Sequence, residues 1–388
     1  MYTRTMIRRT IKKAIQEHLG RGKIIILYGA RRVGKTTLVK EIGNEHGKWS
    51  YLSCDEPNVR DRLTNRTSAE LKSFIGDTEL VVIDEAQRVP NIGITLKLLI
   101  DTYPHLRIIA TGSSSFDLAN KIREPLTGRA FTFHLHPLSL TEIASLHERT
   151  ELDALLPERI ELGMYPAVAT TNRSEATEEL RTITTDYLYR DLLAYEGIRK
   201  PYLLEKLTRL LAKQTGSLVS YTELGDTLQV SRQTVENYVR ILEQAFIIFT
   251  VTPFSRNLRS ELSKKRKIYF YDTGIRNAIL ENLSPLDRRT DIGALWENFV
   301  IAERVKLLNN AGRHPRFHFW RTHEGQEIDL IETEGEDIRA FEIKWQKPRQ
   351  YKIPSKWIEA YSHIPVTLIT RENALDHLLV EFRANPDI

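Results

Sequence analysis

GARRVGKTT, from Gly29 to Thr37, is the stretch on which the first part of the fold depends. An apolar run precedes it at residues 24–28, and a helical pattern follows it from Lys35. In such a strand–loop–helix context, the pattern G-x-x-x-x-G-K-[ST] indicates a loop that binds nucleotide phosphates. Gly29 and Gly34 permit the tight turn that aims successive backbone N–H groups at phosphate oxygens. The helix that follows adds the positive end of its dipole.

We therefore predict an ATP site in this loop. Lys35 would reach the β- and γ-phosphates and act in catalysis, and Thr36 would hold Mg²⁺. The alternative is a glycine turn after a buried strand, with no nucleotide. The predicted nucleotide contacts in the loop are Gly29, Ala30, Arg31, Arg32, Val33, Gly34, Lys35, Thr36 and Thr37.

An acidic pair ends the next strongly apolar run, at residues 80–83. Such a run is typical of a buried parallel strand, and ligands bind at the carboxyl ends of the strands in open α/β sheets. We predict that Asp84 organises Mg²⁺ and that Glu85 orients and polarises the attacking water, as a catalytic residue. The alternative is a strand end that meets a helix cap.

A further strand is predicted at residues 107–112, followed by a serine-rich stretch. Thr111 and Ser113 are candidates to sense the γ-phosphate, although one of the serines could instead cap a helix, and both roles could hold together. We expect an additional strand to separate the strand of the phosphate loop from that of Asp84.

The composition indicates a soluble globular protein of two to four domains, with 388 residues, 41% hydrophobic and 28% charged. The single cysteine, Cys54, excludes an intrachain disulfide framework and fits a reducing compartment. No apolar stretch is long enough to span a bilayer, and the run at 24–28 is too short for a signal peptide, so we predict a cytoplasmic protein. The net charge of +5 favours a polyanionic partner only weakly.

A helix-turn-helix pattern occupies residues 220–244, and strands are predicted at 246–251 and 268–271 with a basic loop between them. In a DNA-binding module of this kind, the second helix enters the major groove and the loop contacts phosphates. Such modules also serve as protein-interaction units or spacers, and a basic loop is often only a solvated surface. The candidate DNA contacts are Arg232, Gln233, Asn237 and Arg240 on the helix, and Arg256, Arg259, Lys264, Lys265, Arg266 and Lys267 in the loop.

Four chemically suggestive residues lie near the C-terminus. Glu297 falls among apolar neighbours on a predicted helix, and Asp329 lies on a strand. Alternation places Glu342 and Lys344 on one face of the next strand, and the hairpin brings Asp329 alongside. An ion pair on an exposed strand would explain Glu342 and Lys344 equally simply.

The chain resembles the bacterial and archaeal AAA-superfamily ATPases that carry a DUF4143 C-terminal region. GARRVGKTT, VVIDEAQ, ATGSSS, LTGR and HPLSLTE carry the resemblance. It implies that Arg129, in the Gly-Arg pair after the serine-rich stretch, acts on the γ-phosphate in cis or from a neighbouring subunit of a homo-oligomer. The alternative is an arginine that pairs with a nearby acid.

The C-terminal residues resemble the PD-(D/E)xK nuclease superfamily, although Ile328 stands where proline is common. The resemblance implies that Glu297, Asp329 and Glu342 bind Mg²⁺ and that Lys344 is a catalytic lysine. The predicted fold class is α/β: a P-loop NTPase parallel sheet of the AAA type, then a winged helix, then a restriction-endonuclease-like domain. The predicted boundaries are 1–140, 141–200 (a helical lid or linker), 201–285 and 286–388.

The leading hypothesis is an ATP-dependent enzyme that processes nucleic acid, with DNA as its partner and ATP and Mg²⁺ as cofactors. The alternative is a regulatory ATPase switch whose C-terminal regions bind DNA or protein without cleaving.

Overall fold

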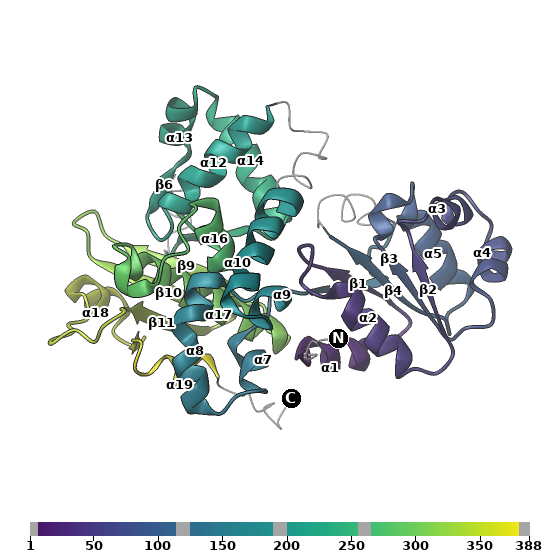
Figure 1. Ribbon diagram of the computed structural model, residues 1–388, viewed down its shortest axis with the longest axis horizontal. Helices are drawn as coiled ribbons and strands as arrows, with labels where there is room; N and C mark the ends of the chain where they lie inside the picture. The colour runs from purple at the N-terminus through teal and green to yellow at the C-terminus, as the bar shows by residue number, and fades with distance from the viewer. Residues whose placement is uncertain (1–6, 114–124, 189–199, 255–264, 380–388) are drawn as a thin grey trace. The chain divides into compact units, whose positions relative to one another are not determined.

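The computed structural model describes residues 7–113, 125–188, 200–254 and 265–379, with the side chains of residues 186–188 left aside (Figure 1). These residues form two compact units. The N-terminal unit is built from residues 9–137, joined by residues 244–246. The C-terminal unit contains residues 138–243 and those from 247 onward. Arg256, Arg259 and Lys264, predicted to contact DNA, lie outside the described residues.

The N-terminal unit contains a five-stranded sheet in the order β2-β3-β4-β1-β5, with all pairings parallel. β4 lies between β1 and β3, which confirms the additional strand expected between the phosphate loop and Asp84. The strands are β1 (Ile24–Tyr28), β2 (Trp49–Ser53), β3 (Leu80–Asp84), β4 (Arg107–Gly112) and β5 (Ala130–His134). The helices are α1 (Ile11–His18), α2 (Lys35–Asn44), α3 (Pro57–Leu63), α4 (Ser68–Ile75), η1 (Ala86–Arg88) and α5 (Ile92–Thr102).

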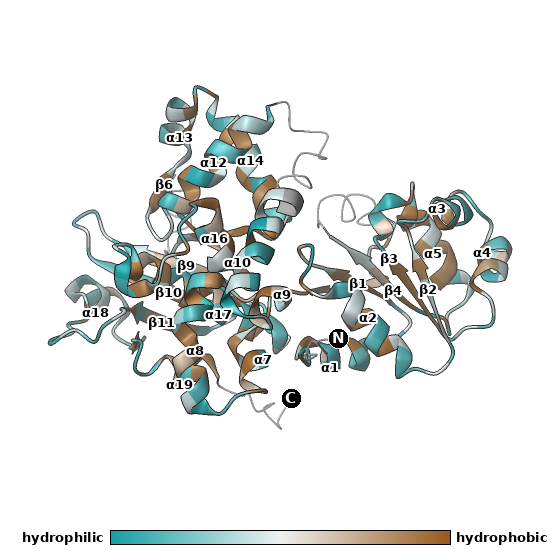
Figure 2. Cartoon of the chain, viewed as in Figure 1, coloured by the Kyte–Doolittle hydropathy of each residue, from teal (hydrophilic) through white to brown (hydrophobic). Residues whose placement is uncertain are grey.

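The middle residues of β3 and β4 are apolar, in keeping with the brown colour of this part of the sheet in Figure 2. Every residue of β1 and β3 is buried, because helices cover both faces of a parallel sheet. α1 begins at Ile11 and ends at His18. α4 begins after Thr67, whose side chain forms a capping box with Glu70.

The C-terminal unit contains a seven-stranded mixed sheet in the order β12-β11-β10-β9-β7-β8-β6. β7 pairs in parallel with β9, with Thr252 opposite His318. The strands predicted for residues 201–285 and for 286–388 therefore lie in one sheet, while the domain boundaries themselves stay a prediction. The strands are β6 (Leu218–Ser220), β7 (Ile248–Pro253), β8 (Lys265–Phe270), β9 (Arg316–Arg321), β10 (Glu327–Glu334), β11 (Asp337–Ile343) and β12 (Val366–Ile369).

The longest helix of this unit, α17 (Ile292–Asn310), packs its large apolar side chains against the sheet. Trp296 and Phe299 share a buried cluster with Phe319, Leu330 and Phe341 from β9, β10 and β11. The other helices are α7 (Leu140–Ala144), α8 (Arg149–Leu162), α9 (Pro166–Ala169), α10 (Arg173–Thr182), η2 (Ile183–Leu188), α12 (Pro201–Lys213), α13 (Tyr221–Leu228), α14 (Arg232–Gln244), α16 (Thr273–Ile279), η3 (Leu286–Arg288), α18 (Ser355–Tyr361) and α19 (Ala374–Leu378).

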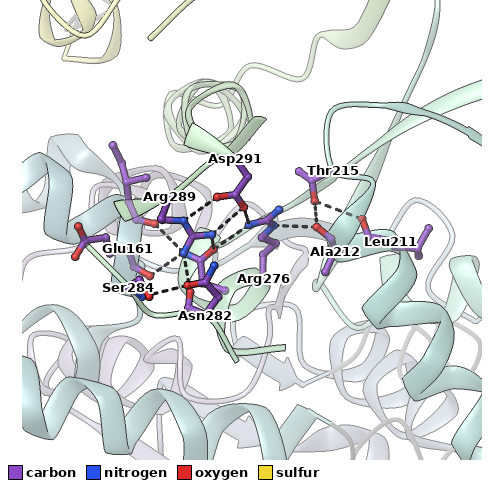
Figure 3. A network of polar contacts seen from close by, with 11 residues as sticks. Glu161, Leu211, Ala212, Thr215, Arg276, Asn282, Ser284, Arg289 and Asp291 are labelled. Atoms are coloured by element: carbon purple, nitrogen blue, oxygen red, sulfur yellow. Dashed lines mark hydrogen bonds and ion pairs between the residues drawn. The ribbon is translucent and has the colours of Figure 1, made fainter. Parts of the chain in front are cut away.

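A buried polar network joins α12, α16 and the start of α17 (Figure 3). The guanidinium groups of Arg276 and Arg289 donate to Asp291 Oδ2 at 2.5 and 2.9 Å, and Arg276 also donates to the carbonyl of Ala212 at 2.9 Å. Burial alone would raise the pKa of Asp291, but hydrogen bonds from the two arginines outweigh it and hold the pKa at about 2. Asp291 therefore stays charged across the physiological range.

The turn after α8 packs tightly against the start of α16. Asp272 caps α16 by accepting from Ile275 N at 3.0 Å, and its second oxygen accepts from Met164 N at 2.7 Å. A side chain on Gly274 would place its Cβ 1.9 Å from the carbonyl oxygen of Leu162. Gly163, with φ +84, turns the chain next to Asp272. Gly274 is therefore required by a close approach of backbone, and Gly163 by its left-handed φ and by the adjacent carboxyl group of Asp272.

Candidate functional site

The predicted phosphate loop connects β1 to α2 in the N-terminal unit. Gly34 (φ +98) and Arg32 (φ +63) both adopt the left-handed region, so the loop turns sharply just before α2 begins at Lys35. A side chain on Gly29 would meet the carbonyl oxygen of Leu135 at 2.2 Å, so only glycine fits there. The loop thus has the tight backbone that phosphate binding requires.

Two cations hold the backbone of this loop. Lys35 Nζ donates to the carbonyls of Gly29 and Ala30 at 2.8 and 3.0 Å. Arg9 donates to the carbonyl of Val33 at 2.6 Å and to that of His136 at 2.7 Å, and only 8% of Arg9 is exposed. Sequence analysis missed Arg9, because a basic N-terminus gives no signal of a contact with residues so distant in the chain.

Asp84, at the end of β3, is the centre of a buried hydrogen-bond cluster. Its Oδ2 accepts from Thr36 Oγ1 at 2.8 Å and from Tyr51 Oη at 2.5 Å, and its Oδ1 accepts from Thr111 Oγ1. Only 3% of Asp84 is exposed. Burial and the hydrogen bond to Asp84 raise the pKa of Tyr51, so its hydroxyl stays a donor. The structure brings Thr36, Asp84 and Thr111 together, and it adds Tyr51, which the sequence analysis did not single out.

Glu85 follows with a strained backbone, at φ +55. Its N–H donates to Thr111 Oγ1 at 3.1 Å. Its Oε2 accepts from Gln87 Nε2 at 2.5 Å and from Ser113 Oγ at 3.1 Å. Thr111 and Ser113 therefore both contact the acidic pair, and Gln87, to which the sequence analysis assigned no role, helps to fix the carboxylate.

Arg129 lies away from the phosphate loop and the acidic pair. It directly precedes β5, whose first residue pairs with the first residue of β1, so Arg129 is at the amino ends of the strands. The phosphate loop is at their carboxyl ends, one five-residue strand away, or about 17 Å. Arg129 Nε donates to Asp101 at 2.8 Å instead. The predicted action of Arg129 on the γ-phosphate of its own chain is therefore wrong. The structure contains the alternative, an arginine that pairs with a nearby acid. Action on the γ-phosphate of a neighbouring subunit stays a prediction.

A second group of charged residues lies in the C-terminal unit, between β10 and the end of β11. Asp329 Oδ2 accepts from Ile343 N at 2.9 Å and from Lys344 Nζ at 3.2 Å. Lys344 Nζ also pairs with Glu342 Oε1 at 2.7 Å. Burial, and then the negative charge of Asp329, raise the pKa of Glu342 to about 7. The structure thus brings together three of the four residues of the nuclease-like set.

Glu297, the fourth residue, is bound to other partners. Its Oε1 accepts from Lys267 Nζ at 3.0 Å and from Tyr269 Oη at 2.5 Å, and Lys267 also pairs with Glu327 at 2.5 Å. Because only 2% of Lys267 is exposed, its predicted contact with DNA phosphate is wrong. Within the described parts of the chain, no three His, Cys, Asp or Glu side chains are arranged to hold a metal ion. The predicted three-carboxylate metal site is therefore not assembled.

The candidate DNA-contacting residues of α14 share one side of the helix. Asn237 Oδ1 accepts from Gln233 Nε2 and from Arg240, both at 3.4 Å. Arg232, Gln233 and Arg240 are exposed and Asn237 is half-buried. Among the described loop residues, Lys265 is exposed and Arg266 is half-buried, with its guanidinium 5.6 Å from the centre of the Tyr221 ring.

The parallel sheet, the phosphate loop and the acidic end of β3 define a P-loop ATPase domain of the AAA type. An AAA domain matches residues 21–144, a domain of unknown function (DUF8612) residues 153–286, and a second (DUF4143) residues 292–376. The uncharacterized protein Rv2008c of Mycobacterium tuberculosis is 31% identical over 343 residues, which cover 87% of this chain and 74% of that protein. The chain belongs to the family in which an AAA domain precedes a DUF4143 domain.

The chain has two more distant similarities. The uncharacterized protein MJ1637 of Methanocaldococcus jannaschii is 25% identical over 335 residues, covering 75% of this chain and 70% of that protein. The solved structure described as the Walker-type ATPase PABY2304 of Pyrococcus abyssi covers 70% of this chain and 94% of its own, with a TM-score of 0.48 and 16% identity. No helix in the described ranges is both long and apolar enough to cross a membrane.

Proposed function

We propose that this protein hydrolyses ATP at the phosphate loop and uses the hydrolysis cycle to act on DNA through its C-terminal unit. The observation that carries the proposal is the convergence of Thr36, Thr111 and Tyr51 on buried Asp84, with Glu85 beside it. Phosphoryl transfer needs mainly positioned charges and donors, and this cluster supplies them at the carboxyl ends of β3 and β4.

The residues around Asp84 fit a bound Mg²⁺. Asp84 Oδ2 and Thr36 Oγ1 lie 2.8 Å apart, and a carboxylate together with a hydroxyl is a donor set that Mg²⁺ accepts alongside phosphate oxygens. When bound, the ion would neutralise charge on the β- and γ-phosphates. Thr36 and Asp84 would hold it.

The remaining residues position the reacting groups. Lys35 would exchange the carbonyls of Gly29 and Ala30 for phosphate oxygens when nucleotide binds. Glu85 would orient a water whose oxygen bonds to the γ-phosphorus as the bond to the β–γ bridging oxygen breaks. Two donors already occupy Glu85 Oε2, so Oε1 is the oxygen that would accept from this water.

Replacing Gln87 with Ala tests this positioning. Because Gln87 fixes the Glu85 carboxylate and is not a predicted nucleotide contact, kcat should fall about 10-fold while KM for ATP changes less than about 2-fold. Steady-state phosphate release gives both constants. An unchanged kcat, or a loss confined to KM, would show that Gln87 does not position the catalytic carboxylate.

DNA contact is proposed for the exposed side of α14. The order α12, β6, α13, α14, β7, β8 is that of a winged helix, and the exposed Arg232, Gln233 and Arg240 are suited to base and phosphate contacts. The competing proposal is a regulatory ATPase whose C-terminal unit binds DNA or protein without cleaving it.

ATP hydrolysis measured against single-stranded, duplex and branched DNA and against RNA tests the proposed function. We expect at least one nucleic acid to stimulate hydrolysis, and the double variant Arg232→Ala with Arg240→Ala to lose most of that stimulation. Arg21→Ala with Lys97→Ala, which removes two exposed cations of the N-terminal unit, is the matched control. Hydrolysis that no nucleic acid alters would contradict action on DNA.

A second candidate function, metal-dependent phosphodiester cleavage, is favoured by the convergence of Asp329, Glu342 and Lys344. Among the described residues, buried Glu342 Oε2 has no hydrogen-bond partner. Two carboxylates, one of them with an unpartnered oxygen, fit a single Mg²⁺ whose remaining ligands are water. The bound ion would polarise a phosphoryl oxygen. Glu297 is not part of this set, because Lys267 and Tyr269 hold it.

Cleavage of DNA in Mg²⁺ or Mn²⁺ by the wild type and by Glu342→Ala and Lys344→Ala separates the two candidates. We expect each substitution to reduce cleavage by about 100-fold or more, because each removes a group that touches the reacting phosphate or its cation. If the wild type cuts no substrate while ATP hydrolysis is intact, the regulatory alternative stands.

A further inference from the structure

The segment that follows Lys344 is strongly basic. Between residues 343 and 358 the chain contains five cations, Lys344, Lys347, Arg349, Lys352 and Lys356, and no aspartate or glutamate. Residues 345–354, here called the basic loop, form neither helix nor strand and connect the end of β11 with α18. This loop is longer than the two to six residues usual for such connections, and long ordered loops are often functional.

Both ends of the basic loop are anchored in the core. The ring of Trp345 meets that of Trp296 edge-on at 5.4 Å between centroids. Ile353 packs against the buried cluster that contains Trp357 and Tyr361. Groups presented by the loop therefore stand on a fixed scaffold beside the Asp329–Glu342–Lys344 cluster.

Two unsatisfied polar atoms belong to the basic loop and to the end of β11, and together with Lys344 they are here called the pocket. Among the described residues, the hydroxyl of Tyr351 and Glu342 Oε2 are both buried and have no hydrogen-bond partner. Burial, and then the negative charges of Glu342 and Asp329, raise the pKa of Tyr351, so its hydroxyl stays a donor. An unsatisfied buried polar atom costs about 1–3 kcal/mol, so each of these two atoms is suited to a bound ligand.

The outward side of the basic loop presents cations that no acid neutralises. Lys347, Arg349 and Lys352 are exposed, and no acidic side chain within the described ranges pairs with any of the three. By contrast, Lys356 pairs with Glu324 at 3.4 Å, and Arg321 in β9 pairs with Glu327 at 2.8 Å. Three such cations within six residues make a local positive surface that borders the pocket.

We propose that the basic loop binds the phosphate backbone of a nucleic-acid strand and places one phosphodiester in the pocket formed by Tyr351, Glu342 and Lys344. Lys347, Arg349 and Lys352 contact successive phosphates, and the Tyr351 hydroxyl donates to the phosphodiester. The proposal rests on the second candidate function for the identity of the pocket, although the binding it describes does not require cleavage. A phosphodiester is favoured over an acidic peptide because Lys344 and the two carboxylates are the groups of phosphoryl chemistry.

Fluorescence anisotropy of the full-length protein with labelled single-stranded DNA, duplex DNA and RNA tests the loop. The measurement is made in EDTA, so that binding is separated from cutting, and over a range of salt concentrations. The triple variant Lys347→Ser, Arg349→Ser, Lys352→Ser should weaken binding at least 10-fold and reduce the slope of log affinity against log salt by about two to three, as loss of three phosphate contacts requires.

The matched control removes three exposed cations elsewhere: Arg21→Ser, Lys97→Ser, Lys213→Ser. It makes the same change in net charge, and none of the three pairs with an acid in the described part of the chain. It should change the affinity less than about 3-fold. Equal losses in both triple variants would mean that only net charge matters, and an unchanged affinity and salt slope in the loop variant would overturn the proposal. Thermal unfolding midpoints confirm that both variants are folded.

Tyr351→Phe tests the pocket itself. With Ca²⁺ in place of EDTA, we expect the wild type to bind DNA more tightly, and Tyr351→Phe to lose at least 3-fold of that gain. An equal gain in both proteins would exclude Tyr351 from the site.

If the wild type never cleaves but the loop variant loses binding, the candidate nuclease activity fails and the loop proposal stands. If the wild type cleaves and the loop variant binds normally, the candidate nuclease activity stands and the loop proposal fails. A labelled polyglutamate peptide that competes as well as DNA would favour an acidic protein partner and overturn the assignment.

Discussion

Replacing Lys35 with Ala is expected to abolish ATP turnover, with a loss of at least about 100-fold in kcat/KM. Lys35 is 5% exposed, and its ammonium group lies within hydrogen-bond distance of two carbonyls of the phosphate loop. Of the three cations in the loop, Lys35 is buried, whereas Arg31 is half-buried and Arg32 is exposed. Removal of a single preorganised donor from a water-excluded site typically costs about 10²–10³ in rate.

The measurement is phosphate release at saturating ATP, with nucleotide binding followed separately by a fluorescent analogue. Lys97→Ala, on α5 of the same unit, is the control, because Lys97 is exposed and has no acidic partner among the described residues. It should hydrolyse ATP at the wild-type rate. Retained turnover in Lys35→Ala would refute the assignment of residues 29–37 as the ATP site.

Gly274→Ala is expected to destabilise the C-terminal unit by about 3 kcal/mol or more. The new Cβ would lie 1.9 Å from the carbonyl oxygen of Leu162 and 2.7 Å from the backbone N of Gly163. Neither atom belongs to a flexible side chain, so the start of α16 must move away from the end of α8. That movement would break the hydrogen bond from Met164 N to Asp272. Overpacking a rigid site costs about 1–3 kcal/mol, and the lost cap and hydrogen bond add to it.

Gly293→Ala is the matched control, because Gly293 also lies in the first turn of a helix, α17, and a Cβ there would meet nothing within 4 Å. In an exposed helix Ala is up to about 1 kcal/mol more favourable than Gly, so this variant should be neutral or slightly stabilised. Denaturant unfolding followed by far-ultraviolet circular dichroism measures both. Equal stability of the two variants would show that α8 and α16 do not approach as closely as described.

The sequence predicted the ATPase fold well because the information is local. Gly29, Gly34 and Lys35 occupy consecutive turns of one loop, and the apolar run before Asp84 can only be a buried strand in an α/β sheet. The additional strand between β1 and β3 was also predicted, whereas the full order β2-β3-β4-β1-β5 came from the structure. The proximity of Thr36 and Thr111 to Asp84 could also be predicted, because strand ends in a parallel sheet meet at one edge.

The residues that sequence analysis missed are held by long-range contacts. Arg9 reaches the phosphate loop across more than twenty residues of sequence, and Tyr51 reaches Asp84 only because β2 is next to β3. Lys267 shows the opposite error. It ends a basic run, so it was assigned to the exposed loop, but it lies within β8, where exposure falls along the strand from its first residue. Its neighbour Lys265 is exposed, whereas Lys267 is buried against Glu297 and Glu327.

The parallel pairing of β7 with β9 has a practical consequence for anyone who cuts the chain. Cutting the chain between η3 and α17 would separate β7 from β9 and expose the paired edge of each strand. Lys267 would also lose its ion pairs with Glu297 and Glu327. Each fragment would then present unpaired backbone N–H and C=O groups along a strand, a surface that promotes aggregation. Fragments divided there are expected to be insoluble when made separately and to recover only when both are present during refolding, as two halves of one sheet.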